Sequence, residues 1–379
     1  MKIGVDVVPL KRQRTGIGNY VVGLLELLPQ IAPEHEYLIY SNQRVDLLSS
    51  GPPFQERIDG GFRWCPGSFW LLGRCGALAR NDKLDLFWAT GTVLPPFLPP
   101  GTVKVVTVYD LVWLRCPETT TSYNLLIQRL CTRKAIANAD LILVISRATQ
   151  DELVTRLQVP REKTRLVYPG ISDRYRPHDF RTAARFIATK YNVPDRYMAT
   201  VGTIEPRKNL ALLVQVLRIL KDNRRLECPL LVVGAKGWGN SHFFREIQAS
   251  GLTTNEIRFL GYMPDQDMPF FYSGAEVFLF PTLYEGFGFP PVEAMACGAP
   301  VIASNAECMP EVLGDAAILE PPTNAQRFAT AITNVLSDES LRETMRVRGI
   351  RQAQKFSPRG SAQRLLEIFE ERYCQTTHA

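Results

Sequence analysis

The stretch Phe280-Pro-Thr-Leu-Tyr-Glu285-Gly-Phe-Gly-Phe-Pro-Pro-Val-Glu293-Ala-Met-Ala-Cys-Gly298 carries the clearest structural pattern in the chain. A short apolar run ends at Phe280, two glycines interrupt the segment that follows, and two prolines suit the first turn of a helix. The pattern predicts a buried strand, a loop that carries Glu285, and a helix that carries Glu293 in its first turns. Both carboxylates can reach one edge of a sheet, where Gly286 and Gly288 would free backbone amides for a phosphate or a sugar hydroxyl.

Short apolar runs rich in Val, Ile and Phe alternate with longer segments of helical period along the rest of the chain. Continuous apolar strands joined by helical segments are typical of parallel sheets that helices cover on both faces. Because the pattern starts twice, we predict an α/β protein with two doubly wound domains, each binding ligands at the carboxyl ends of its strands. The expected strands are Lys2–Val8, Leu84–Trp88, Val103–Val108, Leu141–Ile145, Arg165–Val167, Tyr197–Val201, Pro229–Val233, Ile257–Leu260, Val277–Phe280, Val301–Ala303 and Ala316–Leu319, and the clearest helices are Tyr20–Ile31, Tyr123–Asn138 and Asn209–Asp222.

Two breaks that contain proline divide the chain. The stretch Tyr168-Pro-Gly-Ile-Ser-Asp-Arg-Tyr-Arg-Pro177 has no periodicity, and Phe356-Ser-Pro-Arg-Gly360 precedes a last helical segment. We therefore expect a first domain over 1–170, a second domain over 171–356, and a helix within 357–379 that packs back on the first domain. A length of 379 residues agrees with two cores rather than one.

The net charge of +6 is uneven, since residues 1–170 carry 20 Lys and Arg against 15 Asp and Glu, whereas 171–379 carry 24 against 23. Two interpretations stay open: a mildly basic protein, and a first domain that meets an anionic membrane or a phosphorylated lipid. The segment Arg63-Trp-Cys-Pro-Gly-Ser-Phe-Trp-Leu-Leu-Gly-Arg74 mixes aromatic and basic residues as membrane-surface helices do, although core aromatics explain it equally well. Nucleic acid is not an expected partner, because the positive charge is spread along the chain.

The sequence also favours a cytoplasmic location, with peripheral contact at the inner face of the membrane as the further possibility. The start, Met1-Lys-Ile-Gly-Val-Asp-Val-Val8, indicates a strand instead of a signal peptide. No apolar run reaches the roughly 18 residues of a membrane span. Eight cysteines without a Cys-x-x-Cys pair suit small buried thiols in a reducing compartment. Four histidines, none near another, argue against a zinc site.

The segment Val201-Gly202-Thr-Ile-Glu205-Pro-Arg207-Lys208-Asn209 follows the first predicted strand of the second domain. Arg207 and Lys208 are adjacent cations before a helix that Asn209 could cap. A guanidinium and an ammonium at the carboxyl end of a strand would stabilise the negative charge of a departing diphosphate. A solvated basic turn is the structural alternative.

Two segments of the first domain also follow predicted strands. Arg14-Thr-Gly16-Ile-Gly18-Asn19-Tyr20 would let the backbone approach a phosphate at a helix start. Val21 stands where a dinucleotide fingerprint needs a third small residue, which argues against a nicotinamide cofactor. Tyr109 and Asp110 end another strand and could hydrogen-bond sugar hydroxyls. A plain strand–helix turn and a strand-terminating aspartate are the structural alternatives.

Together these segments resemble the retaining GT-B glycosyltransferases of family four (glycosyl transferases group 1), over nearly the whole chain. The most specific part is Glu285–Glu293 with the Ala-Met-Ala-Cys-Gly-Ala-Pro-Val-Ile302 that follows. Gly202-Thr-Ile-Glu-Pro-Arg-Lys-Asn-Leu210 comes next, and the Gly-Ile-Gly-Asn-Tyr turn, Ile145-Ser-Arg-Ala-Thr149 and Phe259-Leu-Gly-Tyr262 add support. The resemblance implies two Rossmann-like domains that face a cleft holding the donor, and a C-terminal helix that crosses back to the first domain.

The resemblance also implies roles for individual residues. Arg207 and Lys208 would bind the donor diphosphate, the Gly16–Gly18 turn would close over it, Glu293 would hold the ribose, and Phe259–Tyr262 would flank the base. Glu285 would lie beside the transferred sugar. The residues expected to be catalytic are Glu285, Arg207, Lys208 and Asp110, and those expected to bind the donor are Gly16, Gly18, Tyr109, Gly202, Arg207, Lys208, Leu260, Tyr262, Glu285, Gly286, Phe287, Gly288, Phe289 and Glu293.

Tyr109 departs from the family pattern, because many relatives have His-Asp-Leu where this chain has Tyr109-Asp110-Leu111. That histidine is thought to touch the donor sugar. A tyrosine can donate a hydrogen bond but cannot serve as a base near neutral pH. The role of position 109 therefore stays open.

Neither a cofactor nor a bound metal is implied, since the nucleotide-diphosphate sugar is the substrate. Asp265-Gln266-Asp267 has the spacing that chelates a divalent metal in another class of glycosyltransferases. Here it opens an apparent helix, Met268–Ser273, and acids in a first helical turn complement the helix dipole. We therefore interpret these aspartates as helix-start residues.

Retention without an obvious nucleophile favours a front-face reaction, in which the departing phosphate takes the acceptor's proton. The Glu-Gly-Phe-Gly-Phe-Pro-Pro and Glu-Pro-Arg-Lys-Asn-Leu segments look most like mannosyltransferases of bacterial surface-polysaccharide assembly. GDP-mannose is thus the leading donor, ahead of rhamnosyl, glucosyl or galactosyl donors such as UDP- or dTDP-sugars. The acceptor would be a saccharide, free or linked to polyprenyl diphosphate.

Three rival functions come from other classes. A sugar-binding protein with two Rossmann-like lobes would not need Arg207 and Lys208 beside a glycine loop. A pyridoxal-dependent phosphorylase shares the GT-B architecture and would show visible absorbance from its cofactor. A nucleotide-sugar epimerase would not release nucleotide diphosphate only when acceptor is present.

Overall fold

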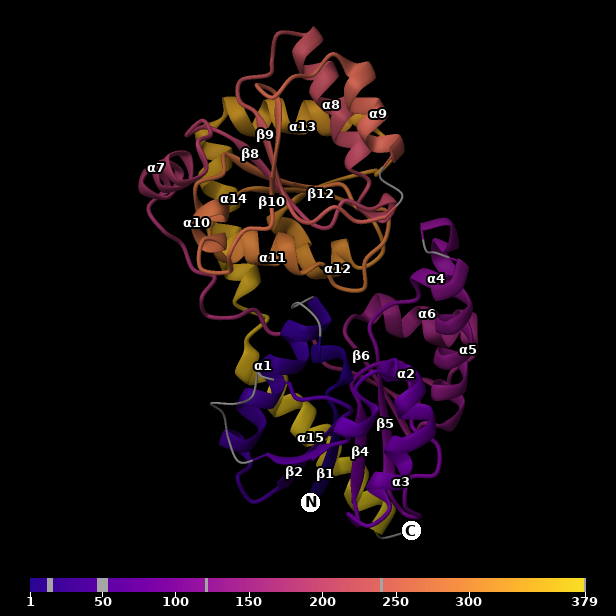
Figure 1. Cartoon of the computed structure of the whole chain (residues 1–379). Helices are drawn as coiled ribbons and strands as arrows, with labels where there is room; N and C mark the ends of the chain where they lie inside the picture. The colour runs from indigo at the N-terminus through magenta and orange to yellow at the C-terminus, as the bar shows by residue number, and fades with distance from the viewer. Residues whose placement is uncertain (12–15, 46–53, 120–121, 239–240, 378–379) are drawn as a thin grey trace. The chain divides into compact units, whose positions relative to one another are not determined.

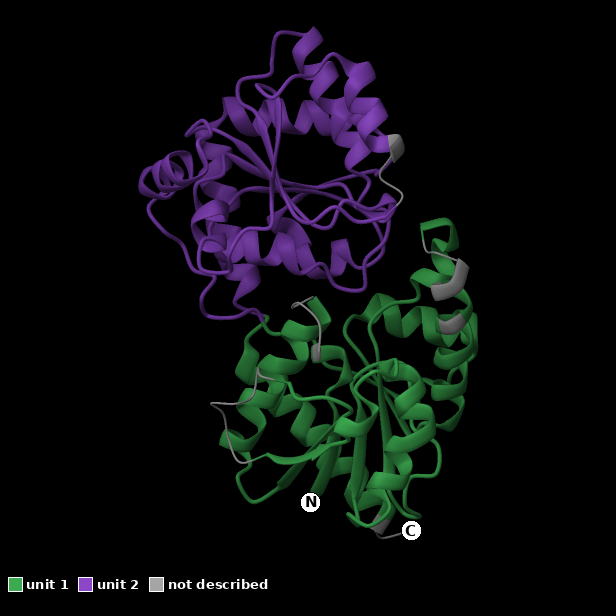
Figure 2. Ribbon diagram, viewed as in Figure 1, with its two compact units in different colours: residues 1–170, 356–379 green, residues 171–355 purple. Residues whose placement is uncertain are grey.

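The computed structural model describes residues 1–11, 16–45, 54–119, 122–238 and 241–377. It has two compact units (Figure 2): unit 1 comprises Met1–Gly170 and Phe356–Ala379, and unit 2 comprises Ile171–Lys355. Each unit holds one parallel sheet with helices packed on its faces (Figure 1). The predicted class, an α/β protein with two doubly wound domains, is confirmed.

Unit 1 contains a seven-stranded parallel sheet in the order β3-β2-β1-β4-β5-β6-β7. Its strands are β1 (Lys2–Asp6), β2 (Glu36–Ser41), β3 (Gln55–Ile58), β4 (Leu86–Ala89), β5 (Val103–Val108), β6 (Leu141–Val144) and β7 (Thr164–Leu166). Its helices are α1 (Gly16–Ile31), α2 (Gly67–Trp70), α3 (Gly76–Ala79), α4 (Val112–Arg115), α5 (Ser122–Asn138), α6 (Arg147–Leu157) and α15 (Pro358–Thr377). A π-helical turn, Leu71–Cys75, joins α2 to α3.

Two strands of unit 1, β2 and β3, are absent from the sequence prediction. β2 is apolar, and all but its first residue are buried. β3 reads Gln-Glu-Arg-Ile and lies at the edge of the sheet, where its polar side chains reach solvent. Charged side chains are a common feature of edge strands. Such a strand leaves no apolar run in the sequence.

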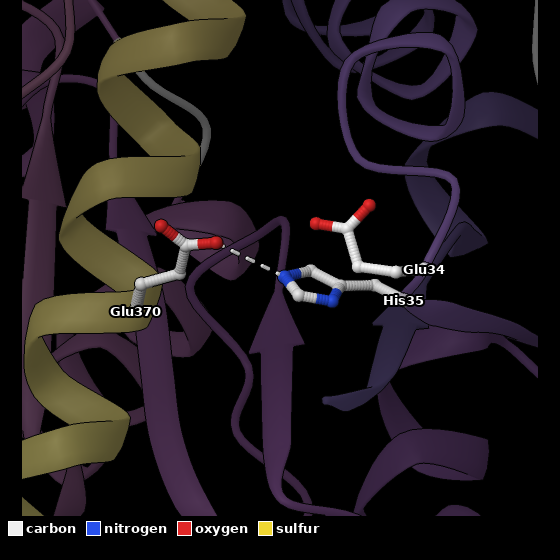
Figure 3. A group of neighbouring side chains, drawn as sticks. All are labelled: Glu34, His35 and Glu370. Carbon is white, nitrogen blue, oxygen red and sulfur yellow. Dashed lines mark hydrogen bonds and ion pairs between the residues drawn. The ribbon is translucent and has the colours of Figure 1, made fainter.

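The C-terminal helix α15 packs on unit 1, as the sequence predicted. It lies against α1 and β5, and the ring of Phe369 meets that of Trp88 with centroids 5.9 Å apart. At its start the hydroxyl of Ser361 donates to the carbonyl of Tyr168 at 2.6 Å. Its Glu370 Oε1 lies 3.2 Å from Nε2 of His35 (Figure 3).

Figure 3 also places Glu34 beside His35. Glu34, His35 and Glu370 each offer one ligand atom, and these atoms lie within 4.8 Å of one another. This group could not be predicted from the sequence, because Glu370 is 335 residues from His35. All eight cysteines are free thiols; the prediction of burial holds for Cys75, Cys228, Cys297 and Cys308.

Unit 2 contains a six-stranded parallel sheet in the order β10-β9-β8-β11-β12-β13. Its strands are β8 (Met198–Val201), β9 (Leu230–Val233), β10 (Ile257–Gly261), β11 (Val277–Phe280), β12 (Val301–Ser304) and β13 (Ile318–Glu320). Its helices are α7 (Phe180–Tyr191), α8 (Leu210–Asp222), α9 (Ser241–Ser250), α10 (Met268–Ser273), α11 (Phe289–Ala296), α12 (Met309–Leu313), α13 (Ala325–Ser337) and α14 (Glu339–Ala353). Figure 1 shows α8, α9 and α13 on one face of this sheet and α10, α11 and α12 on the other.

Both sheets reverse their strand order once. In unit 1 the reversal lies between β1 and β4, and in unit 2 it lies between β8 and β11. The helical connections leave toward opposite faces on the two sides of such a point, which opens a crevice at the carboxyl ends of the strands. The segments with predicted roles that follow β1, β8 and β11 therefore leave their sheets beside these reversals.

The segment Arg63–Arg74 divides between surface and core. Trp64 and Phe69 are 77% and 56% exposed, whereas Trp70 and Leu71 are buried. Trp64 and Phe69 suit the interpretation as membrane-surface residues, whereas Trp70 suits the interpretation as a core aromatic. Neither interpretation holds for all three. Among the residues that the structure describes, no helix has the length and apolar character needed to cross a membrane.

Candidate functional site

Two loops leave the unit 2 sheet at its strand reversal. Gly202–Asn209 follows β8 and Pro281–Gly288 follows β11, and β8 and β11 are paired neighbours. The first loop packs tightly against the end of β9. A Cβ atom on Gly234, which has a φ of +147°, would lie 2.0 Å from the carbonyl oxygen of Gly202. Only glycine permits this close approach of the two backbones.

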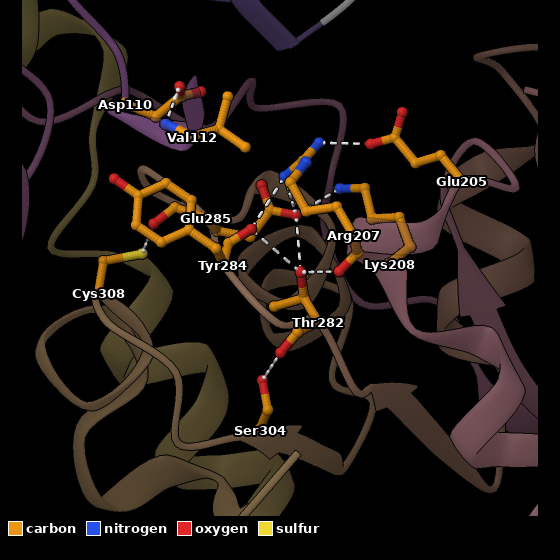
Figure 4. A network of polar contacts seen from close by, with 10 residues as sticks. All are labelled: Asp110, Val112, Glu205, Arg207, Lys208, Thr282, Tyr284, Glu285, Ser304 and Cys308. Atoms are coloured by element: carbon orange, nitrogen blue, oxygen red, sulfur yellow. Dashed lines mark hydrogen bonds and ion pairs between the residues drawn. The ribbon is translucent and has the colours of Figure 1, made fainter. Parts of the chain in front are cut away.

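Glu285, on the second loop, contacts two cations from the first (Figure 4). Its Oε1 lies 2.7 Å from Nη1 of Arg207 and 2.5 Å from Nζ of Lys208. The hydroxyl of Thr282 lies 3.2 Å from the same oxygen. On the far side of the guanidinium, Oε1 of Glu205 lies 2.7 Å from Nη2 of Arg207. These ionic side chains are at most 20% exposed, so their interactions are stronger than they would be in water.

The pKa of Glu285 lies far below neutral pH. Burial opposes its ionisation, but the charges of Arg207 and Lys208 outweigh burial and lower the pKa of Glu285 to about 2. Glu285 is therefore ionised at neutral pH and holds both cations in place before a ligand binds. Prearranged cations at the carboxyl edge of a sheet suit the charge of a phosphate group.

Further hydrogen bonds join the two loops. The amide of Leu283 donates to the carbonyl of Arg207 at 2.9 Å, and Nη1 of Arg207 donates to the carbonyl of Tyr284 at 3.0 Å. The side-chain amide of Asn209 donates to the carbonyls of Pro281 and Pro322 at 3.0 and 2.8 Å. Asn209 holds the N-cap position of α8, as predicted, but its side chain makes no capping hydrogen bond to that helix. It fastens the loop after β8 to the loop after β11 instead.

The glycines after Glu285 lead into α11 as the sequence predicted. Gly288 has a φ of +84°, and a Cβ atom there would lie 2.5 Å from Cε of Met309. The helix starts at Phe289, with proline in its first turn. The rings of Phe287 and Phe289 are 5.3 Å apart, and Phe287 is buried. The loop thus brings the backbone of Gly286–Phe289 to the same edge as the two cations.

Glu293, on α11, has different surroundings. Its Oε2 accepts a hydrogen bond from Tyr272 at 2.8 Å, and Tyr175 also hydrogen-bonds to this carboxyl group. Burial raises the pKa of Glu293 to about 7, and the bonds from the two tyrosines limit the rise. Glu293 therefore titrates near neutral pH, where Glu285 stays charged.

Leu260 and Tyr262 lie at the end of β10, two strands from β8. Tyr262 is 60% exposed. Nearby, Phe259 contacts the ring of Phe244 with centroids 5.6 Å apart, and Nζ of Lys236 lies 5.5 Å from the centre of the Phe244 ring. Exposed aromatic rings of this kind can stack on a nucleobase.

The two carboxylates of Asp265-Gln266-Asp267 have partners within unit 2. Nζ of Lys190 lies 2.7 Å from the buried carboxylate of Asp267, and the hydroxyl of Tyr191 donates to it at 2.5 Å. Asp265 pairs with Arg174 at 3.1 Å. Each aspartate thus has a basic partner as well as its place before α10.

The predicted residues of unit 1 lie at the start of α1 and just after β5. Gly16 and Gly18 belong to the first turn of α1 and not to a turn before it, while Arg14 and Thr15 lie outside the described residues. Asp110 accepts a hydrogen bond from the amide of Val112 at 3.1 Å, a local turn contact (Figure 4).

Tyr109 is buried, with 8% of its surface exposed. Its hydroxyl donates to the carbonyl of Thr90 at 2.6 Å, and its ring meets that of Tyr20 edge to face. Burial raises the pKa of Tyr109, so the phenol stays neutral. Its one O–H donor is used inside unit 1, which does not suit the predicted contact with a sugar hydroxyl.

The structure thus brings Arg207, Lys208, Glu285 and the Gly286–Phe289 backbone together at one edge of unit 2. Three residues that contact the predicted carboxylates were missed: Thr282 beside Glu285, and Tyr175 and Tyr272 beside Glu293. Thr282 lies inside the segment Phe280–Gly298 that opened the sequence analysis. Neither tyrosine has a local signal that could have found it.

The chain is similar to known proteins over nearly its whole length. The family model described as Glycosyl transferases group 1 matches residues 184–352, and the model described as Glycosyltransferase Family 4 matches residues 14–175. O-antigen chain mannosyltransferase B of Escherichia coli is 33% identical over 376 residues, covering 94% of this chain and 96% of the relative. O-antigen chain mannosyltransferase RfbU of Salmonella typhimurium is 24% identical over 343 residues, covering 87% and 90%.

A solved structure shares the fold. That of Anabaena Alr3699/HepE in complex with UDP and glucose matches with a TM-score of 0.74 at 19% identity, covering 98% of this chain and all of the other. Two parallel-sheet units of the GT-B type are common to both.

Proposed function

The chain belongs to the glycosyltransferases of group 1 and family 4, and we propose that it is a retaining enzyme that transfers mannose from GDP-mannose to a lipid-linked saccharide. Glycosyl transfer follows from the family, whose O-antigen mannosyltransferases match the chain over nearly its whole length. The observation that carries the mechanism is the contact of Arg207 and Lys208 with Glu285 at the strand reversal of unit 2.

In the proposed reaction Arg207 and Lys208 bind the donor's diphosphate. They stabilise the charge that grows on it as the bond between the sugar's anomeric carbon and the phosphate oxygen breaks. The acceptor hydroxyl forms its bond to that carbon from the same face, and its proton passes to the departing phosphate oxygen. Configuration is then retained without a protein nucleophile. The scheme draws its positive charge from side chains and needs no metal or cofactor.

The two carboxylates take different parts in this proposal. Glu285, ionised at neutral pH, lies next to the cations and favours the positive charge that develops on the sugar ring. Glu293 accepts hydrogen bonds from the ribose hydroxyls, with Leu260 and Tyr262 at the side of the base. Gly202, Gly286, Phe287, Gly288 and Phe289 supply backbone near the diphosphate.

The choice of donor rests on the relatives. Two of them are named as O-antigen chain mannosyltransferases, which supports mannose and hence GDP-mannose. The Anabaena structure contains UDP and glucose, so a UDP-sugar is the second candidate. A dTDP-sugar is the third.

A thermal-shift comparison of GDP, UDP and dTDP tests the donor. A ligand at a hundred times its Kd stabilises the folded state by about 2.7 kcal/mol, so the preferred nucleotide should raise the Tm most. We expect GDP to do so with the wild type and to lose its effect with Lys208→Ala. A larger shift with UDP would reassign the donor base, and no shift with any of the three would contradict the proposed site.

We further propose that the acceptor is linked to polyprenyl diphosphate and that the enzyme works in the cytoplasm, peripherally at the inner face of the cell membrane. The excess of basic residues in 1–170 supports this placement. Labelled mannose should enter the organic phase when the enzyme is incubated with membranes that hold lipid-linked saccharides. Incorporation only into water-soluble saccharides would assign a free saccharide acceptor instead.

A further inference from the structure

A basic hollow lies in unit 1 between the C-terminal half of α5 and the end of α6. Its volume is about 470 Å³, and its lining includes Arg133, Arg156 and Lys163 together with apolar side chains such as Ile136, Leu157 and Val159. α5 leads into β6, and the turn after α6 leads into β7, so the hollow lies at the amino ends of these strands. It shares no residue with the site in unit 2.

Two of the three cations contact neutral groups. The guanidinium of Arg133 lies 5.8 Å from the centre of the Trp113 ring. Nζ of Lys163 donates to the carbonyls of Ile136 and Ala137 at 2.8 and 3.4 Å, where α5 ends. Burial lowers the pKa of Lys163 and the charge of Asp140 raises it only in part, so an anion in the hollow would favour the charged ammonium.

The third cation has a shared partner. Nε of Arg156 lies 3.8 Å from Oε1 of Glu152, but Nε of Arg115 lies closer to that oxygen, at 2.8 Å. Within the described part of the chain, Glu152 is the carboxylate that forms an ion pair with any of the three cations in the hollow. These three cations and Arg115 outnumber the two carboxylates that act on them, Glu152 and Asp140, and leave a net positive field, which a phosphate group would neutralise.

The outward face of α5 continues this surface with apolar residues. Leu126 and Leu130 are 58% and 61% exposed. Steps of four, three and four residues lead from Leu126 through Leu130 and Arg133 to Ala137, so all four lie on one face of the helix, and the last two line the hollow. The sequence of α5 contains three basic residues and no acidic residue. Exposed leucines beside clustered cations are the pattern of a surface that enters the headgroup region of a bilayer.

We propose that this face of α5, with the hollow behind it, docks on an anionic membrane: Leu126 and Leu130 enter the acyl boundary, while Arg133, Arg156 and Lys163 bind the phosphate of a lipid headgroup. The proposal deepens the peripheral membrane contact of the proposed function and rests on it. It places that contact on α5 and α6, and not on the exposed Trp64 and Phe69. A free phosphate compound would fill the hollow without making use of the leucines, which is why a lipid fits better.

Vesicle flotation of the full chain tests this docking. The probes are vesicles of phosphatidylcholine alone and of phosphatidylcholine mixed with phosphatidylglycerol. The wild type should float with the mixed vesicles and stay behind with the neutral ones. Each basic residue at a membrane surface is worth about fivefold in binding, so Arg133→Gln with Arg156→Gln should weaken partitioning about thirtyfold. Leu126→Ser with Leu130→Ser should weaken it at least about tenfold, with less dependence on salt.

The matched control is Arg348→Gln with Arg351→Gln, which removes two exposed arginines from α14 in unit 2 and should leave flotation unchanged. The hollow variants should keep the wild-type thermal shift with nucleotide diphosphate, which separates membrane docking from the donor site. Equal flotation with both kinds of vesicle, or wild-type flotation of the hollow variants, would overturn the proposal. If Trp64→Ala alone abolishes flotation, the docking surface lies elsewhere on unit 1 and the inference is wrong. Loss of the nucleotide shift in the wild type with flotation intact would count against the proposed function only.

Discussion

Glu285 and Glu293 lie on one loop–helix segment of unit 2, yet their surroundings act on them in opposite directions. Two cations contact Glu285 and lower its pKa to about 2, whereas burial among tyrosines raises the pKa of Glu293 to about 7. Neighbouring carboxylates whose pKa values are shifted in opposite directions serve different purposes. Glu285 therefore acts as a fixed charge, whereas the charge of Glu293 depends on its hydrogen-bond partners.

Removing either cation beside Glu285 should reduce turnover more than any other change. Lys208→Ala or Arg207→Ala takes away charge that would stabilise the departing diphosphate and leaves a buried carboxylate with one cation fewer. By analogy with the loss of one donor from an oxyanion hole, turnover should fall about a hundredfold to a thousandfold. The measurement is kcat at saturating donor, with circular dichroism to confirm that the fold is kept.

Arg196→Ala is the matched control for this prediction. Arg196 pairs with Glu276, a buried carboxylate at the start of β11, at 2.8 Å. This variant also deprives a buried carboxylate of its cation, but at the opposite end of the strand from the candidate site. It should lose stability and keep its turnover. Near-normal turnover in both Lys208→Ala and Arg207→Ala would remove the proposed role of the pair.

The second prediction concerns the negative charge of Glu285. Glu285→Gln keeps the size of the side chain and removes its negative charge, so the two cations repel each other and the sugar loses a nearby carboxylate. We expect turnover to fall about a hundredfold. Glu276→Gln is the control, because it neutralises a buried, ion-paired carboxylate at the other end of β11. Equal loss of turnover in the two variants would show that Glu285 acts only through stability.

The sequence predicted well the strand, loop and helix that carry Glu285 and Glu293. Apolar period, glycines and prolines set the strand, loop and helix from Phe280 to Glu293, and all six strands of unit 2 were expected. These signals are local, because buried parallel strands are apolar throughout and prolines favour the first turn of a helix. The polar edge strand β3 has no such signal and was missed.

The contacts that give the two carboxylates different pKa values could not be predicted from the sequence. Tyr272 meets Glu293 from α10, and Tyr175 reaches it from the stretch that was expected only to join the domains. Asn209 has a left-handed backbone, and its side chain links two loops and makes no capping hydrogen bond. The burial of Tyr109 likewise depends on Tyr20 and Thr90, which are far from it in sequence. Tertiary packing decides each of these cases.

The third effect is a pH dependence that differs in sign between the two carboxylates. The folded-state pKa of Glu293 lies above the ordinary value of 4.5, so its contribution to stability is full below that value and is lost as the pH rises through about 7. Between about pH 5 and pH 7, this group alone should lower the free energy of unfolding by about 2 kcal/mol.

Urea unfolding of the wild type and Glu293→Gln over this range measures the effect, since the variant should lack the decline. Glu285→Gln provides the comparison. The pKa of Glu285 is lowered, so its contribution is present above 4.5 and is lost as the pH falls toward 2. The difference between wild type and Glu285→Gln should therefore shrink only in acid. Parallel pH profiles for the wild type and Glu293→Gln would contradict the raised pKa.

The smallest effect tests whether the tyrosines tune Glu293. Tyr272→Phe removes one hydrogen bond that favours the ionised carboxylate, so the pKa of Glu293 should rise further. If the ionised form holds the donor ribose, nucleotide binding at neutral pH should weaken about fivefold, or about 1 kcal/mol, and recover as the pH is raised. Tyr197→Phe is the matched control, because this buried tyrosine donates to the carbonyl of Phe271 at 2.9 Å instead. It should lose comparable stability with no pH-dependent change in binding. If both variants bind nucleotide with the same affinity at every pH, burial alone sets the pKa of Glu293. The hydrogen bond from Tyr272 would then have no effect on it.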